Sequence, residues 1–269
     1  MTFTFKLLLL FSFLTLASCN PGKLDALADI PSSLHETSAI EVVKNKKIVW
    51  IIEDAGNKNH LYGFNTKMKL TKNIEIENAE NIDWEDLTSD NLGNIYIGDF
   101  GNNSKERENF TIYKISNPEK ARKKTSAEVI NFSLPEDMKS ADFESFFLFK
   151  NNFYIFTKDD KKCELLKVPN QIGDHVASYI SEVKLKGKNT KVTSADISDD
   201  GKIVVLLNHD RLWKLTKFKS DDFFNGTIEE LNFDHDTQKE GINLIGMKKV
   251  LLTDEKTKNE GGKLYLYKL

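Results

Sequence analysis

The segment WEDLTSDNLGNIYIG, residues 84–98, contains the pattern that decides the fold. The acidic residue Glu85 opens a short strand-like run, turn-forming residues follow at 91–94, and a second run rich in isoleucine and tyrosine ends at Gly98. Short apolar runs separated by asparagine and glycine are typical of antiparallel strands joined by tight turns. We therefore expect two neighbouring strands at 84–88 and 94–98.

The same unit recurs along the chain. Intervals of 49, 59, 52 and 44 residues separate the acidic residues that open the five units: Glu36, Glu85, Glu144, Asp196 and Glu240. Repeats of this length, built from short strands, are typical of the blades of a β-propeller. The sequence therefore predicts an all-β chain folded as a propeller of five four-stranded blades, with six blades as the alternative.

The strand-like runs can be assigned to blades. We expect strands at 37–43, 47–53, 60–65 and 71–77 in blade one, at 84–88, 94–98, 110–115 and 128–133 in blade two, at 143–149, 152–157, 164–168 and 179–185 in blade three, at 194–198, 202–207, 211–216 and 227–233 in blade four, and at 242–245, 249–253 and 263–268 in blade five. Blade five is one strand short, and residues 24–30 could supply it. Closure by the opposite end of the chain would hide exposed sheet edges. Short helical turns are expected near 118–122 and 221–224, and the three tryptophans are expected in the blade cores.

The first 18 residues have the pattern of an export signal, because an apolar run at 7–16 is too short to span a bilayer and ends in small residues. Residues 16–19, LASC, look like a bacterial lipobox, which predicts a lipid on Cys19. We therefore expect a signal peptide at 1–18, a lipidated tether at 19–23 and one propeller domain at 24–269. Asn20 favours the outer membrane by analogy with Gram-negative lipoproteins. The alternative is an ordinary signal peptide with an incidental cysteine.

Composition narrows the possible binding partners and the interactions that could stabilise the fold. After removal of the signal and tether, Cys163 is the only cysteine, so stability must come from packing and not from an internal disulfide. The chain has 38 Lys and Arg against 41 Asp and Glu, and the lysines are scattered. No basic stripe for nucleic acid is present. The expected partners are the membrane, through Cys19, and a small molecule, glycan or envelope protein.

A propeller would bring residues from distant parts of the chain to one end of its axis. The innermost strand of each blade begins at one end of the axis. The loop between the second and third strands of the same blade lies at that end too. The residues that we expect there as a ligand-binding site are Glu36, Glu85, Glu144, Asp196, Glu240, Asp54, Asp99, Asn102, Asn103 and Asp254. His209, in the fourth of these loops, is the best candidate for a general base.

Carboxylates that converge in this way favour a hard cation. Burial and mutual repulsion raise their pKa values unless a positive charge compensates. Calcium binds carboxylate and amide oxygens, so the five repeated acids, Glu36, Glu85, Glu144, Asp196 and Glu240, are candidate calcium ligands. Zinc is disfavoured because the histidines lack ligand spacing. The structural alternative is that the acids brace neighbouring blades through hydrogen bonds and ion pairs.

The segments NIDWEDL at 81–87 and IYIGDFGNN at 95–103 resemble exported bacterial β-propeller lipoproteins related to the group named for the esterase-like activity of phytase. Looser similarity extends to residues 142–144, 193–201 and 240–242, so the resemblance covers most of the chain after the signal. It implies a propeller with a cation near the axis. Lys158 stands where blade two has Asp99, and no catalytic residue of the related hydrolases aligns with this chain.

These observations predict an envelope-anchored propeller lipoprotein that binds a ligand or partner at an acidic end of its axis, where calcium is the candidate cofactor. The alternative is a calcium-dependent hydrolase of phosphate esters or lactones, which would need a base beside the metal. A third possibility is a passive scaffold with an apolar patch on its outer rim. Fold alone does not decide among the three.

Overall fold

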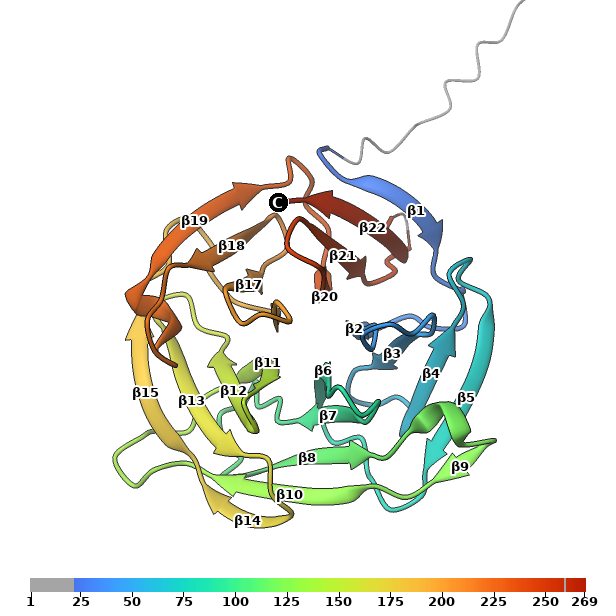
Figure 1. Cartoon of the computed structure of the whole chain (residues 1–269), viewed down its shortest axis with the longest axis horizontal. Helices are drawn as coiled ribbons and strands as arrows, with labels where there is room; N and C mark the ends of the chain where they lie inside the picture. The colour runs from blue at the N-terminus through green and yellow to red at the C-terminus, as the bar shows by residue number, and fades with distance from the viewer. Residues whose placement is uncertain (1–21, 259) are drawn as a thin grey trace, which may run out of the picture.

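Five sheets of antiparallel strands surround a central axis in the structure, a computed structural model that describes residues 22–258 and 260–269 (Figure 1). The predicted five-bladed propeller is confirmed. The inner strand of each blade lies nearest the axis, and the following strands lie progressively further out (Figure 1). The predicted signal at 1–18 and Cys19 lie outside the described residues.

The blades follow one another along the chain. Blade one contains β2 (Thr37–Glu41), β3 (Val49–Glu53), β4 (His60–Phe64) and β5 (Leu70–Ile76). Blade two contains β6 (Trp84–Ser89), β7 (Ile95–Asp99), β8 (Asn109–Ile115) and β10 (Glu128–Ser133). Blade three contains β11 (Phe143–Phe149), β12 (Asn152–Thr157), β13 (Cys163–Pro169) and β15 (Ser178–Val183). Blade four contains β16 (Ser194–Ile197), β17 (Ile203–Leu207), β18 (Arg211–Thr216) and β19 (Thr227–Asn232).

Blade five joins the two ends of the described chain. It contains β20 (Lys239–Ile245), β21 (Lys249–Asp254) and β22 (Lys263–Lys268). Its outermost strand is β1 (Asp25–Asp29), which pairs antiparallel with β22, so the predicted closure by the N-terminal strand is confirmed. Because the closing strand comes from the opposite end of the sequence, the ring is held shut by backbone hydrogen bonds.

Two blades have a fifth strand that the sequence reading did not predict. Strand β9 (Lys124–Thr125) belongs to the connection between β8 and β10 but pairs parallel with β5 of blade one. Likewise β14 (Gly173–Val176), from the connection between β13 and β15, pairs parallel with β10 of blade two. Each of these connections therefore covers the outer edge of the preceding blade, which protects that edge from pairing with another chain.

Five apolar clusters fill the spaces between the blades, one at each interface. Side chains alternate between the two faces of a strand, so each blade packs against both neighbours. The three tryptophans are fully buried: Trp50 and Trp84 lie between blades one and two, and Trp213 lies between blades three and four. Their predicted core role is confirmed. The expected helical turns are the 3-10 helices η1 (Pro118–Lys120) and η2 (Phe223–Asn225).

Candidate functional site

Backbone irregularities at the starts of the inner strands place acidic side chains beside the axis. Strands β6, β11 and β20 each have a β-bulge, an extra residue that the neighbouring strand does not match. The extra residues are Glu85, Glu144 and Glu240. A bulge redirects the side chain of the residue that it inserts. All three carboxylates lie at the end of the axis where the inner strands begin, which we call the acidic end.

Blades one and four have uncharged residues at the same position. In β2 the extra residue is Ser38, and in blade four Thr193 donates its backbone N–H to the carbonyl of Leu207, the residue opposite Ser194. Glu36 precedes β2, is exposed and accepts a hydrogen bond from the Asn57 side chain at 2.7 Å. The five predicted acids therefore do not form one ring.

Asp196 lies at the opposite end of the axis. Its carboxylate accepts a hydrogen bond from the Leu244 N–H at 2.6 Å, and it shares a pocket with Glu41. In sequence Asp196 resembles the other repeated acids, but it comes three residues after Thr193, the equivalent of Glu85. Along these three residues the inner strand runs away from the acidic end.

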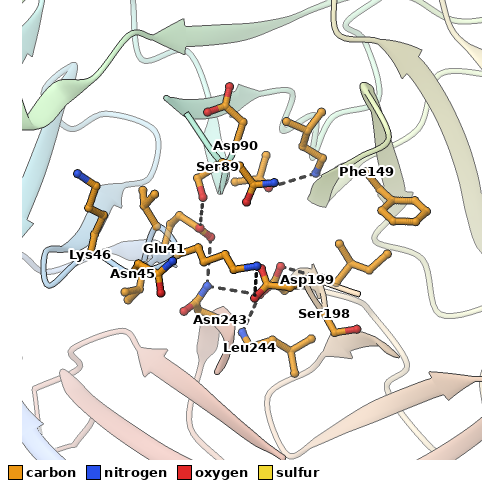
Figure 2. Close-up of a pocket in the computed structure, with 18 of the residues that line it drawn as sticks. Glu41, Asn45, Lys46, Ser89, Asp90, Phe149, Ser198, Asp199, Asn243 and Leu244 are labelled. Carbon is orange, nitrogen blue, oxygen red and sulfur yellow. Dashed lines mark hydrogen bonds and ion pairs between the residues drawn. The ribbon is translucent and has the colours of Figure 1, made fainter. Parts of the chain in front are cut away.

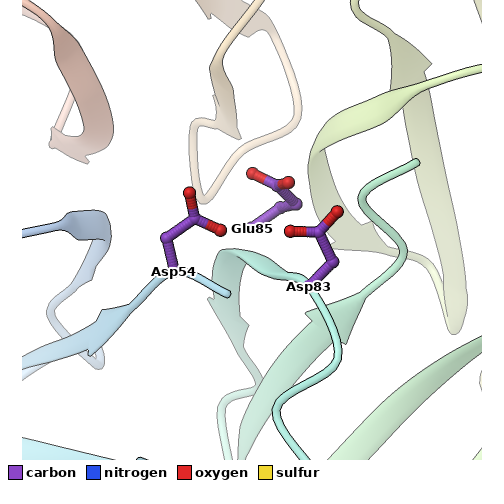
Figure 3. A group of neighbouring side chains, drawn as sticks. All are labelled: Asp54, Asp83 and Glu85. Atoms are coloured by element: carbon purple, nitrogen blue, oxygen red, sulfur yellow. The ribbon is translucent and has the colours of Figure 1, made fainter. Parts of the chain in front are cut away.

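Three carboxylates converge at the acidic end (Figure 3). One oxygen from each of Asp54, Asp83 and Glu85 lies within 4.8 Å of the others. Asp54 follows β3, while Asp83 precedes β6 and Glu85 lies within it, so blades one and two both contribute. Only 6% of Glu85 is exposed, and none of the residues that the structure describes donates a hydrogen bond to its carboxylate. Glu85 is thus a buried acid whose carboxylate has no hydrogen-bond donor within the described part of the chain.

A glycine makes room beside these acids. Gly101 follows β7, and its backbone N–H donates to the carbonyl of Asp83 at 3.2 Å. A side chain at Gly101 would collide with the carboxylates of Glu85 and Asp83. The absence of a side chain at Gly101 therefore leaves space for oxygen atoms that a larger residue would occupy.

Burial and like charges raise the pKa values of this group. Burial, followed by repulsion from Asp54, raises the pKa of Asp83 to about 7. Burial raises the pKa of Glu85 well above its ordinary value, and Glu144, Asp54 and Asp83 add to the effect. Such values mean that the acids hold protons near neutral pH unless a cation replaces them.

Lys158 supplies part of the missing positive charge. Its ammonium group forms an ion pair with Oε1 of Glu144, whose other oxygen, Oε2, is buried without a hydrogen-bond partner in the described chain. Burial lowers the pKa of Lys158, but Glu144 and Glu240 outweigh that effect and keep the lysine protonated. The one lysine is nevertheless surrounded by several carboxyl groups, so it cannot neutralise all of them when they are ionised.

A histidine and one further acid complete the acidic end. Nε2 of His209 lies 3.0 Å from Oε1 of Glu240, so the predicted general-base candidate is paired with a carboxylate. Glu255, in the loop after β21, has a pKa raised to about 8 by burial and then by Glu240, Asp54 and Glu36. A nitrogen base, several carboxylates and an ammonium group therefore share this end of the axis.

Four other predicted site residues lie apart from this group or are bonded elsewhere. Asp99 is fully buried and forms an ion pair with Arg107 at 3.0 Å. The side chain of Asn102 donates to Ser140 and Ala141 and accepts from two backbone N–H groups. Asp254 is fully buried and accepts from Thr237, Lys263 and Tyr265. These three residues brace loops, and Asn103 is exposed.

Sequence reasoning omitted Asp83 and Glu255 from the candidate site. Asp83 comes two residues before Glu85 in the Asp-Trp-Glu segment, and that spacing across the start of a strand was the available signal. Glu255 directly follows Asp254, which was selected in its place. Sequence alone could not tell which of two adjacent acids turns toward the axis.

Asp86 separates the two ends of the axis. It is fully buried, and its carboxylate accepts hydrogen bonds from the backbone N–H groups of Leu87, Phe146 and Ala195 and from the hydroxyl of Ser194. These donors belong to blades two, three and four. Asp86 therefore joins three inner strands midway along the axis.

Comparison with known proteins supports the fold. No protein-family model matches the sequence, and no curated protein sequence is similar to it. Among solved structures, the chain is similar to the aldose sugar dehydrogenase of Streptomyces coelicolor in its PQQ-bound form, with a TM-score of 0.53, 8% identity, and coverage of 92% of this chain and 98% of that chain. It is also similar to a candidate gluconolactonase, with a TM-score of 0.51, 11% identity and 92% coverage of both chains.

A third similar structure is a nidogen/laminin complex, with a TM-score of 0.50, 10% identity, and coverage of 81% of this chain and 72% of that chain. Two of these three structures are thus named as enzymes and the third as a protein complex. At such low identity the similarity shows a β-propeller fold and leaves the function to the site. No helix within the described residues is long and apolar enough to span a membrane.

Proposed function

We propose that this chain is an envelope-anchored β-propeller that binds calcium at the acidic end and, through it, an oxygen-rich small molecule, glycan or envelope protein. The observation that carries the proposal is the convergence of Asp54, Asp83 and Glu85, with carboxylate oxygens within 4.8 Å of one another. Three acids this close cannot all stay ionised without a positive charge nearby. The buried Glu85 carboxylate, to which no described residue donates a hydrogen bond, favours a cation over a purely structural role.

The donor atoms fit calcium better than zinc. The converging groups are carboxylate oxygens, the ligands that hard cations prefer, whereas zinc sites usually include histidine or cysteine. The nearby His209 is already paired with Glu240. When bound, calcium would neutralise the converging acids and offer remaining coordination positions to oxygen atoms of a ligand. The absence of a side chain at Gly101 leaves room for the carboxylates of Glu85 and Asp83 beside it.

Thermal unfolding with calcium or EDTA tests the proposal. We expect calcium to raise the melting temperature of the wild type by at least about 3 °C, since roughly 1 kcal/mol of binding energy has that effect in a domain of this size. Glu85→Gln should abolish most of the increase, and a double Glu85→Ala, Glu144→Ala variant should abolish all of it. Asp137→Asn, which changes an exposed acid away from the site, should respond as the wild type does. Identical wild-type curves in calcium and EDTA would remove the metal from the proposal.

A second candidate function is a calcium-dependent hydrolase, and the pairing of His209 with Glu240 favours it. A carboxylate that accepts a hydrogen bond from one imidazole nitrogen leaves the other nitrogen able to take a proton from water. The hydrolase reading predicts calcium-dependent cleavage of a phosphate ester or a lactone that His209→Ala slows by at least about 100-fold. Calcium binding without cleavage of either substrate class would exclude the hydrolase and support the binding function.

Anchoring at Cys19 is the part of the proposal that rests on sequence. The lipobox-like segment LASC at 16–19 supports it, and several acyl chains on one residue give durable membrane attachment. Metabolic labelling with a fatty acid should label the wild type and not Cys19→Ser, which should leave the membrane fraction. A labelled Cys19→Ser protein, or an unlabelled wild type, would contradict the anchor without affecting the calcium test.

A further inference from the structure

A pocket of about 800 Å³ lies at the end of the axis opposite the acidic end (Figure 2). Its floor is formed where the inner strands of several blades end. We call it the axial pocket and define it by its floor residues: Glu41, Thr88, Ser89, Asp196 and Asn243. The fully buried Asp86, which is hydrogen-bonded to three inner strands, lies between this pocket and the calcium site proposed above. The two sites are therefore separate.

Two carboxylates from different blades lie on the floor of the axial pocket. Glu41, at the end of β2, accepts a hydrogen bond from the Ser89 hydroxyl at 2.6 Å and is 5% exposed. Asp196, in β16, accepts backbone N–H groups of Ile197 and Leu244 at 2.7 and 2.6 Å. The side-chain amide of Asn243 lies between them and donates to Glu41 at 3.3 Å and to Asp196 at 3.4 Å (Figure 2).

No lysine or arginine of the described chain forms an ion pair with either floor carboxylate. Three lysines line the pocket, and two of them have partners that line it too. Lys44 is ion-paired with Asp199, Lys46 is ion-paired with Glu119, and the ammonium of Lys150 lies 4.9 Å from the ring centroid of Phe149. The two floor carboxylates therefore have no ion-paired lysine or arginine among the described residues, although the Lys44–Asp199 ion pair lies in the same pocket.

Two buried polar groups on the floor have unused hydrogen-bonding capacity. Asn243 is 4% exposed, and none of the described groups donates a hydrogen bond to its side-chain oxygen. Thr88 is 5% exposed, and its hydroxyl accepts the Leu148 N–H at 3.1 Å but donates to no described group. Buried polar groups are normally satisfied, so unused capacity beside a cavity points to a missing partner.

We propose that the axial pocket binds a small organic molecule through a primary ammonium group. An ammonium has three N–H donors, and the floor offers acceptor oxygens of Glu41, Asp196 and Asn243. A divalent metal fits less well, because only two carboxylates reach the floor and the described chain has no group of three metal-binding side chains here. The cavity volume is in the range of sites for sugar-sized ligands, so room remains for the rest of the molecule.

The charge state of the floor supports this assignment. Burial, followed by the negative charge of Asp196, raises the pKa of Glu41 to about 8, while hydrogen bonds from Ser89 and Asn243 act in the opposite direction. Asp199 adds a smaller repulsion. Burial likewise raises the pKa of Asp196 to about 7. An ammonium that binds at neutral pH should therefore displace protons from the floor.

Saturation-transfer NMR with matched probes tests the proposal. Glucosamine and 1,4-diaminobutane should give binding signals, whereas glucose and 1,4-butanediol, which lack the ammonium, should bind at least about tenfold more weakly. Glu41→Gln and Asp196→Asn should each weaken binding of the amines by at least about tenfold, since each removes a charge partner of the ammonium. The exposed variant Asp137→Asn should bind them as the wild type does.

Three further observations keep the test decisive. The two variants change different blades, and circular dichroism would identify one that fails to fold. Calorimetry in two buffers of different ionisation enthalpy should detect proton release on binding. Excess calcium should not displace the amines, which separates this pocket from the acidic end. The proposal is overturned if the neutral probes bind equally well, if both variants bind normally, if calcium competes, or if neither amine binds.

Discussion

Individual buried carboxylates connect the blades of this propeller near its axis. Asp86 illustrates the role, because one side chain accepts hydrogen bonds from donors in three blades. Burial raises its pKa well above the ordinary value, and the four donors act in the opposite direction. The acid is thus held by the protein itself, unlike Glu85, for which the described chain offers no donor.

Removing the Asp86 carboxylate should destabilise the fold. Asp86→Ala leaves the backbone N–H groups of Phe146 and Ala195 buried without acceptors, and each unsatisfied group costs about 1–3 kcal/mol. We expect the free energy of unfolding to fall by about 3–5 kcal/mol in a denaturant titration. Asp137→Ala, at an exposed site, should change it by less than about 0.5 kcal/mol. A stable Asp86→Ala variant would show that water replaces the carboxylate.

At this scale the sequence predicted part of the site. Glu85, Glu144 and Glu240 were recognised because each opens a repeat, and the structure places all three at the acidic end. Asp196 was grouped with them because it is the acidic residue that opens the fourth unit at a similar interval. A bulge has no reliable sequence signal, so the true equivalent, Thr193, could not be distinguished from its neighbours.

Among the elements, β1 closes the ring. It pairs with β22, and the apolar residues at its two flanks enter different blade interfaces: Leu24 packs between blades four and five, and Ile30 packs between blades five and one. Each is only 3% exposed, whereas Leu27 within the strand is 52% exposed. The strand is therefore fixed at both ends by side chains and along its length by the backbone.

Truncation of these three residues should have unequal effects. Leu24→Ala and Ile30→Ala should each lower the free energy of unfolding by about 2–4 kcal/mol, because each leaves a cavity in an apolar cluster. Leu27→Ala is a matched control on the same strand and should change it by less than about 0.5 kcal/mol. Chemical denaturation of the three variants measures these losses of unfolding free energy. Equal losses at all three positions would contradict the role of Leu24 and Ile30 in fixing β1.

Element positions were largely predictable, and β9 and β14 were not. The main strands could be predicted because each combines apolar alternation with flanking turn residues. By contrast, β9 has two residues and β14 has four, and both are mostly polar or partly exposed. Their strand character comes from pairing with the edge of the preceding blade. Such pairing depends on the ring geometry, which no local pattern contains.

Across the whole molecule, raised carboxyl pKa values should make stability depend on pH. Burial is the largest cause in each case, and it raises the pKa of Asp83 and Asp196 to about 7 and of Glu41 and Glu255 to about 8. Between the ordinary values near 4 and these raised values, the folded state binds more protons than the unfolded state does. Its free energy of unfolding therefore falls as pH rises through this window and levels off above it.

In EDTA, the melting temperature should be higher at about pH 5.5 than at about pH 8, by at least about 3 °C. Calcium should raise the melting temperature more at the higher pH, because protons compete for the same carboxylates at the lower one. Asp83→Asn should reduce the pH dependence, while Asp137→Asn should leave it unchanged. A metal-free protein that is more stable at the higher pH would show that the acids are already neutralised by other groups.

The pairing of β1 with β22 also sets an order of events during biosynthesis. The ribosome releases β1 before the other strands of the propeller, and its partner β22 is the last of them to emerge. Until β22 has been synthesised, β1 has no native strand to join, and blade five cannot form. A chain of this design therefore closes its ring only after all five blades have been synthesised.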